Sequence, residues 1–128
     1  MVKPAAIIFG IVFLAIGILG FVPGVTTDMN GMPMLLGIFH VNTAHNVVHL
    51  LSGVAALLSG LASAGAARLY FRIFGLVYAL VAVLGFVQGD SMLLGLISNN
   101  MADTWLHVGI AAVSLFLGFA APAEQATP

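Results

Sequence analysis

Four ionisable side chains stand at helical spacing in two short stretches of the chain. His45 and His49 are four residues apart, and Asp103 and His107 repeat that separation later in the sequence. Residues four apart lie on one face of an α-helix, so each pair predicts two side chains that point the same way. Imidazole and carboxylate groups bind transition metals such as zinc and copper. The spacing therefore predicts a metal site, provided that the two helices face each other.

Polar residues flank both pairs at matching positions. Asn42 and Asn100 each precede the first ionisable residue by three positions, which is the spacing expected of helix N-caps. Asn46 and Thr104 follow at equivalent positions and could orient the ring nitrogens of metal ligands. His40 lies in the preceding segment and is a candidate for an additional ligand.

An internal repeat relates the two stretches. Residues 8–24 match residues 73–89 at more than half of the aligned positions, and residues 34–37 match residues 92–95. Each copy then continues with Asn-x-x-(His/Asp)-x-x-x-His. The repeat predicts one transmembrane domain spanning residues 1–128. It would contain a first repeat at about 4–64, a second at about 69–121 and a tail at 122–128.

The composition indicates an integral membrane protein. Hydrophobic residues make up 62% of the 128 residues, charged residues 5%, and the mean hydropathy is +1.19. Soluble domains carry about 25% charged residues. Four continuously apolar segments, at residues 4–22, 43–64, 69–88 and 102–120, are close to the length of about 20 residues that crosses a bilayer. We predict an all-α fold, a four-helix transmembrane bundle of two tandem helical hairpins, with the lipid bilayer as its partner. The net charge of −1 gives no reason to expect nucleic-acid binding.

Three cations predict the orientation of the chain. Lys3 precedes the first apolar segment, whereas Arg68 and Arg72 lie near the junction of the second and third. The positive-inside rule places these sites in the cytoplasm, together with both termini. The expected location is a bacterial inner membrane, crossed several times, with the His/Asp cluster near the outer face. Residues 34–41 and 92–99 are expected to form short interfacial turns or helices, with Pro33 in a first helical turn.

Helix faces predict which spans meet at the centre of the bundle. Small and polar residues recur at intervals of three and four along residues 43–64 and 102–120. In lipid, such faces pack against other helices because small residues allow close approach and polar residues avoid hydrocarbon. We therefore expect the second and fourth helices to lie together at the centre.

The cluster admits several functions. The favoured one is non-enzymatic binding of a transition metal or a metal-containing cofactor. His45, His49 and His107 could also ligate haem or chlorophyll. The alternatives are a polar network that joins helices in a structural or accessory subunit of a larger membrane complex or homo-oligomer, and proton or ion passage. The chain contains neither an H-E-x-x-H motif nor a glycine-rich nucleotide loop, so the sequence leans away from an enzyme. A membrane metalloenzyme would have to rely on the His/Asp cluster alone.

Methionines gather in the segments expected outside the membrane. Met29, Met32, Met34, Met92 and Met101 all lie there. Thioethers near histidines would suit copper. The other interpretation is that they are flexible apolar side chains at an interface.

The run Val41-Asn42-x-x-His45-Asn46-x-x-His49-Leu50 resembles a family of small bacterial four-helix membrane proteins that is catalogued as a domain of unknown function. The resemblance covers nearly the whole chain. It implies four spanning helices and a membrane location, and it implies no activity, substrate or cofactor.

Overall fold

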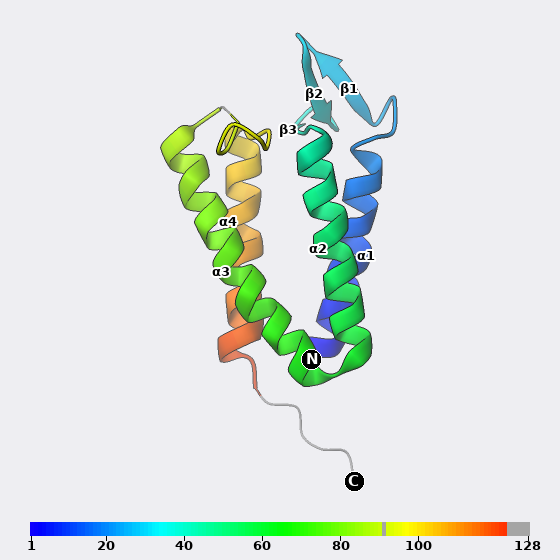
Figure 1. Cartoon of the computed structure of the whole chain (residues 1–128), viewed down its shortest axis with the longest axis vertical. Coiled ribbons are helices and arrows are strands. Elements are labelled where there is room, and N and C mark those ends of the chain that lie inside the picture. The colour runs from blue at the N-terminus through cyan, green and yellow to red at the C-terminus, as the bar shows by residue number, and fades with distance from the viewer. Residues whose placement is uncertain (91, 123–128) are drawn as a thin grey trace.

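The computed structural model describes residues 1–90 and 92–122, and these contain four long helices (Figure 1). All four are long and apolar enough to cross a membrane, which confirms the predicted all-α, multi-pass membrane protein. They are α1 Val2–Leu19, α2 Thr43–Ala62, α3 Ala64–Gln88 and α4 Met101–Leu115, which a π-helical turn, η1 Phe116–Ala120, extends.

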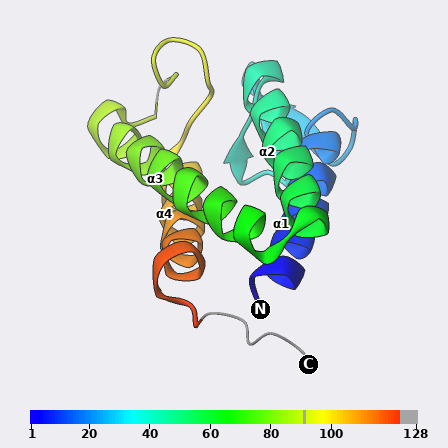
Figure 2. The same ribbon diagram turned by 60° about the horizontal axis from the view of Figure 1, so that its bottom comes forward.

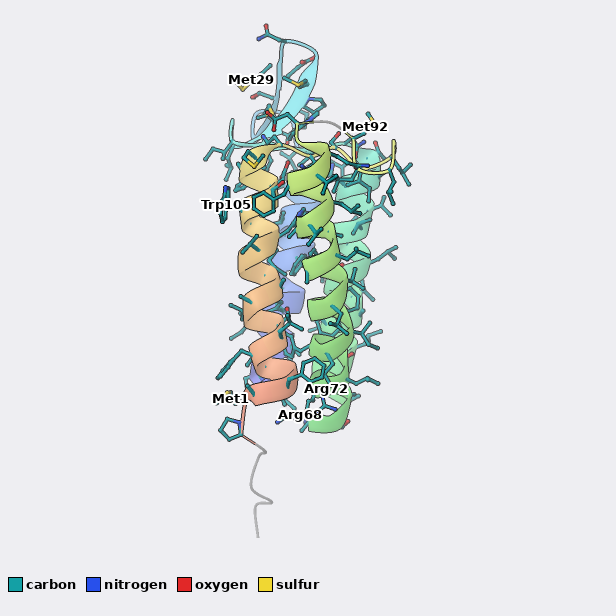
Figure 3. The ribbon with its side chains drawn as sticks, turned by 90° about the vertical axis from the view of Figure 1, so that its left-hand side faces the viewer. Met1, Met29, Arg68, Arg72, Met92 and Trp105 are labelled. Atoms are coloured by element: carbon teal, nitrogen blue, oxygen red, sulfur yellow. The ribbon has the colours of Figure 1, made fainter. Side chains whose placement is uncertain are left out.

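The helices form two hairpins, α1/α2 and α3/α4, that lie beside each other (Figure 2). Met1, Arg68 and Arg72 mark one end of the bundle, called the inner end here, and Met29 and Met92 mark the opposite, outer end (Figure 3). The closest helix pairs are the two within the hairpins. α2 and α4 were expected to lie together at the centre. They bring the ring centroids of His45 and His107 to within 6.0 Å, but the helices within each hairpin pack more closely, because glycines of α1 and α3 allow their partners to approach.

α3 begins five residues earlier than predicted because Ser63 caps it. The Ser63 hydroxyl accepts from the backbone N–H of Ala66 at 3.0 Å, so the helix starts directly after α2 ends. Arg68 and Arg72 consequently lie inside α3 and reach η1 beside it. Arg72 donates to the carbonyl of Gly118 at 2.6 Å. Positive charge next to exposed carbonyls at a helix C-terminus is favourable, so the arginines hold the end of the fourth span.

A small antiparallel sheet covers the outer end of α1 and α2. Its strands, in spatial order, are β1 Thr26–Met29, β2 Met32–Leu35 and β3 Phe39–His40. Residues 34–41, predicted as a short turn or helix, contain a turn at 36–38 but no helix, and strands flank that turn. Pro33 was wrongly expected in a first helical turn, since it lies in β2, opposite Asp28. Asn30 and Gly31 explain the difference, since both have positive φ, at 56° and 82°. That geometry is typical of a two-residue β-hairpin turn.

Residues 92–99 form a turn, one of the two alternatives predicted for them, and not a helix. Leu93 and Ile97 form a β-bridge around a tight turn, in which Leu94 and Gly95 have φ of 54° and 70°. The equivalent residues of the first repeat, 36 and 37, have φ of 56° and 68°. The two outer segments thus share one turn, although only the first carries strands long enough to build a sheet.

Asn42 and Asn100 begin α2 and α4 as predicted. Their side-chain oxygens accept from the backbone N–H groups of His45 and Asp103, at 2.8 and 2.9 Å. The Asp103 carboxylate also accepts from the backbone N–H of Asn100 at 3.0 Å, which completes a capping box. Both helices that carry the candidate ligands therefore start at fixed residues.

The same two asparagines join the halves of the molecule. The amide of Asn42 donates to the carbonyl of Leu96 at 3.0 Å, and the amide of Asn100 donates to the carbonyl of Ile38 at 2.9 Å. These bonds are reciprocal, since each asparagine binds the outer segment of the other repeat at the equivalent position. They hold the outer ends of the two hairpins together.

Two substitutions at Asn42 should distinguish its contribution to stability as the N-cap of α2 from that of its hydrogen bond to Leu96. Serine caps helices as well as asparagine does but is too short to reach Leu96. Asn42→Ala should lower the free energy of unfolding by about 1–2 kcal/mol, and Asn42→Ser by only about 0.6 kcal/mol, an average value for a hydrogen bond between membrane helices. Denaturant titration in detergent micelles measures both. Equal losses in the two variants would show that the cap contributes little.

Candidate metal centre near the outer end of the bundle

Three of the four predicted ligands converge in the bundle. His45 and His49 extend from successive turns of α2, and His107 reaches them from α4. Each offers a ring nitrogen that lies within 4.8 Å of the other two. The ring centroids of His45 and His49 are 4.5 Å apart, and those of His45 and His107 are 6.0 Å apart. All three side chains are buried, at 2–4% exposed.

The carbonyl of Ser98 fixes the orientation of His45. Nδ1 of His45 lies 2.8 Å from this oxygen. A carbonyl oxygen only accepts hydrogen bonds, so Nδ1 carries the proton and Nε2 keeps its lone pair. Metal-binding histidines are commonly oriented in this way by a backbone carbonyl on the other ring nitrogen. Ser98 belongs to the outer segment before α4, and no feature of the sequence pointed to its role.

Aromatic rings position His49 and His107. Phe13 of α1 packs edge-on against His49 with a centroid distance of 5.5 Å, and Tyr78 of α3 lies 5.6 Å from His107. Phe13 and Tyr78 occupy equivalent positions of the two repeats. The alignment of the repeats places an aromatic residue at the same position in both copies, and this was the signal that could have identified them.

Two ring nitrogens of the cluster have no hydrogen-bond partner among the residues that the structure describes. Nδ1 of His49 and Nδ1 of His107 are buried, and neither forms a hydrogen bond within the described part of the chain. A buried polar group that lacks a partner costs about 1–3 kcal/mol. Pairing with a ligand would remove that cost.

Asp103 lies close to this group but does not belong to it. One carboxylate oxygen is occupied by the capping box, and the other, Oδ1, is buried without a hydrogen bond among the described residues. Asp103 and His49 line a common cavity of about 80 Å³, which Phe39 and Val41 close from the outer side. Asp103 thus places a carboxylate beside the histidines.

Asn46 and Thr104 pack against glycines of the neighbouring helix. The Asn46 amide contacts Gly20, the C-cap of α1, and Thr104 contacts Gly85 of α3, again at equivalent repeat positions. Thr104 also accepts from the Asn99 amide at 3.0 Å. Within residues 1–90 and 92–122, neither side chain is hydrogen-bonded to an imidazole, so their visible contacts are between the helices of each hairpin.

His40 lies outside the group of three. It ends β3, opposite Met34 of β2, and is partly exposed. The structure therefore separates the four histidines of the chain into a buried cluster of three and one on the outer sheet.

Two cavities reach the cluster from the sides of the bundle. One of about 80 Å³ is bounded by α2 and α3 and touches all three histidines. The other, of about 200 Å³, is lined by α1 and α4 and touches His49. Its remaining lining is apolar: Ile8, Phe9, Val12, Phe13, Ile16, Leu106 and Ile110.

Four apolar helices around a buried group of three histidines define a small multi-pass membrane protein with a candidate metal centre. The chain belongs to the family described as domain of unknown function DUF4383, whose profile matches residues 3–120. This confirms the resemblance noted from the sequence. No match was found among curated proteins or among solved structures.

Proposed function

We propose that the protein is a non-enzymatic membrane protein that binds a divalent transition metal, such as zinc or copper, at His45, His49 and His107. The observation that carries this proposal is the convergence of three buried imidazoles, two of them with an unpartnered Nδ1. A network built only to join helices would satisfy its own polar atoms, because unsatisfied groups weaken it.

The spacing of the ring nitrogens suits an ion after a small adjustment. Zinc lies 2.0–2.1 Å from histidine nitrogens, so two ligands of a tetrahedral site are about 3.3 Å apart. Nitrogens within 4.8 Å need side-chain rotations of modest size to reach that separation. Three histidines leave a fourth coordination position free for water or another ligand.

Asp103 supports a cation at this site. Three neutral imidazoles leave the full charge of a divalent ion uncompensated, which is costly inside a membrane. The buried Oδ1 of Asp103, in the cavity that His49 also lines, supplies negative charge nearby. We infer that Asp103 acts as charge partner or fourth ligand, in addition to capping α4.

The cavities favour an ion over haem or chlorophyll. Those that touch the histidines have volumes of about 80 and 200 Å³. Pockets for drug-sized ligands have volumes of about 300–1,000 Å³. A macrocycle between α2 and α4 would require the hairpins to move apart, against the reciprocal asparagine bonds.

The orientation of the site follows the distribution of cations. Arg68 and Arg72 lie at the inner end together with Met1, so the positive-inside rule supports cytoplasmic termini. In a bacterial inner membrane, the three histidines would then lie near the outer face. Metal would reach them from the periplasmic side.

Metal analysis of the protein purified from membranes in mild detergent tests the proposal. We expect at least one zinc or copper ion per chain and no haem or chlorophyll absorption band. The apoprotein should bind Co²⁺ with the visible absorption of a nitrogen-ligated, four-coordinate ion. The His40→Ala variant, altered outside the cluster, is the matched control and should bind Co²⁺ normally.

Protein that holds no metal and develops no Co²⁺ absorption would contradict the proposal. Such a result would favour a structural or accessory subunit of a larger complex or homo-oligomer, in which the histidines serve helix packing. A Soret or chlorophyll band would identify a pigment instead.

A further inference from the structure

One face of the outer sheet collects methionines and a histidine. Antiparallel partners point to the same side of a sheet, and residues two apart along a strand do so as well. Met29 pairs with Met32, and Met34 pairs with His40. Because Met32 and Met34 are two residues apart on the central strand β2, all four side chains share one face.

The opposite face of the sheet packs against the helix bundle. Leu35 of β2 is 4% exposed, and it pairs with Phe39 of β3. Both residues line the cavity that contains His49 and Asp103, so this face covers the bundle. The methionine face therefore points away from the cavity above the cluster.

Apolar packing does not account for the methionines. Met29 and Met32 are 46% and 45% exposed, and they flank the hairpin turn. The hairpin extends beyond the outer ends of the helices, and Met29 lies near its tip (Figure 3). β-Branched and aromatic residues suit strands better than methionine does. Three thioethers on one face, two of them exposed and the third, of Met34, half-buried, thus need another explanation.

The register makes each of the four residues a neighbour of at least one other member of the group. Cβ atoms of directly opposed residues lie about 4.5–5.5 Å apart, and residues two apart on a strand are separated by about 7 Å. Methionine has three rotatable bonds beyond its backbone, so its sulfur atoms can turn toward a common point. Met34 and His40 are directly opposed in the register, which brings an imidazole to the thioethers.

The chemistry of these ligands selects Cu(I). Thioether sulfur is a soft, neutral ligand that favours Cu(I), whereas magnesium and calcium prefer oxygen ligands. The chain has no cysteine, so the sulfur ligands that it offers are methionines. A monovalent ion with neutral ligands at an exposed site also needs no buried counter-charge.

We propose that Met29, Met32, Met34 and His40 form a Cu(I) site on the outer sheet, separate from the buried histidines. No oxidation or reduction is involved, since the ion binds and leaves as Cu(I). The proposal does not depend on metal binding by His45, His49 and His107. If both sites bind metal, the sheet is the position at which copper first meets the protein from outside.

The test uses full-length protein in detergent and compares two sets of methionines on a background that lacks the buried site. The background is His45→Ala/His49→Ala/His107→Ala. To it are added either Met29→Leu/Met32→Leu/Met34→Leu or the matched control Met92→Leu/Met101→Leu. The control residues are also exposed at the outer side, at 49% and 40%, but lie outside the sheet. Leucine conserves volume, so these changes should leave the fold intact.

Cu(I) affinity is measured without oxygen, in competition with bicinchoninate. Ag(I) serves as a second probe that does not change oxidation state. We expect one Cu(I) on the background protein and on the control. The sheet variant should bind at least about 100-fold more weakly, because changes just outside a coordination shell already cost about 10–100-fold. Equal binding by the sheet variant and the control would overturn the proposal.

X-ray absorption at the copper edge gives a second readout that also works in the wild-type background, should the triple histidine variant not fold. Sulfur neighbours should be present in wild type and lost in Met29→Leu/Met32→Leu/Met34→Leu. Copper with only nitrogen and oxygen neighbours in wild type would overturn the proposal. His40→Ala should weaken Cu(I) binding and leave Co²⁺ binding by the buried histidines unchanged. The two measurements therefore test the two proposed sites independently.

Discussion

Replacing His49 or His107 with alanine should abolish metal binding in the bundle while the helices remain folded. Each residue provides one of three imidazoles within 4.8 Å of one another, and the remaining two cannot hold the ion alone. We expect Co²⁺ and Zn²⁺ affinity to fall by more than about 100-fold, beyond the 10–100-fold cost of changes outside the coordination shell. Optical titration with Co²⁺, followed by displacement with Zn²⁺, measures the loss.

Stability measurements distinguish a metal site from a polar network. Saturating Zn²⁺, at 100 times its dissociation constant, should raise the free energy of unfolding of wild type by about 2.7 kcal/mol. His49→Ala and His107→Ala should each lose this increase. Without metal, their effects should add, because neither Nδ1 is hydrogen-bonded to another described residue. Strong coupling between the two substitutions in metal-free protein would identify a structural network.

The helices and the meeting of His45, His49 and His107 followed from patterns that the sequence carries directly. Hydropathy marks the spans because lipid requires long apolar helices. The four-residue spacing fixes which side chains share a face, and the repeat places α2 and α4 in equivalent positions. Asn42 and Asn100 were found as caps because the chemistry of a helix start is local.

The outer sheet was not predicted, although the sequence contains the dipeptide that forms its hairpin turn. Asn30-Gly31 is the characteristic dipeptide of a two-residue hairpin turn. Pro33, two residues later, was instead interpreted as part of a first helical turn. The register that puts Met29, Met32, Met34 and His40 on one face depends on this turn. Without the hairpin, the same methionines look like interfacial apolar residues.

The orientation of His45 could not be predicted at all. Its partner is the backbone carbonyl of Ser98, and any residue at that position would offer the same group. Only the path of the outer segment brings it near. The dual position of Asp103, as helix cap and as neighbour of His49, was likewise visible only in part. Sequence patterns predict the candidate ligands, whereas the supporting contacts depend on tertiary structure.

Gly10→Ala should destabilise the bundle more than any ligand substitution. At Gly10, α1 crosses α2 so closely that a Cβ atom would lie 2.8 Å from the carbonyl oxygen of Gly53 and from the backbone nitrogen of Leu57. Backbone atoms cannot rotate away, so the two helices must separate. We expect a loss of about 3 kcal/mol, the upper part of the range for overpacking a well-packed interior.

Gly109→Ala is the matched control, since no atom lies within 4 Å of a Cβ at this exposed position of α4. It should stabilise the helix by about 0.5–1 kcal/mol. Gly10→Ala should also weaken Co²⁺ binding although it removes no ligand, because α1 carries Phe13, which packs against His49. Normal Co²⁺ affinity in a destabilised Gly10→Ala protein would show that α2 and α4 position the imidazoles without α1.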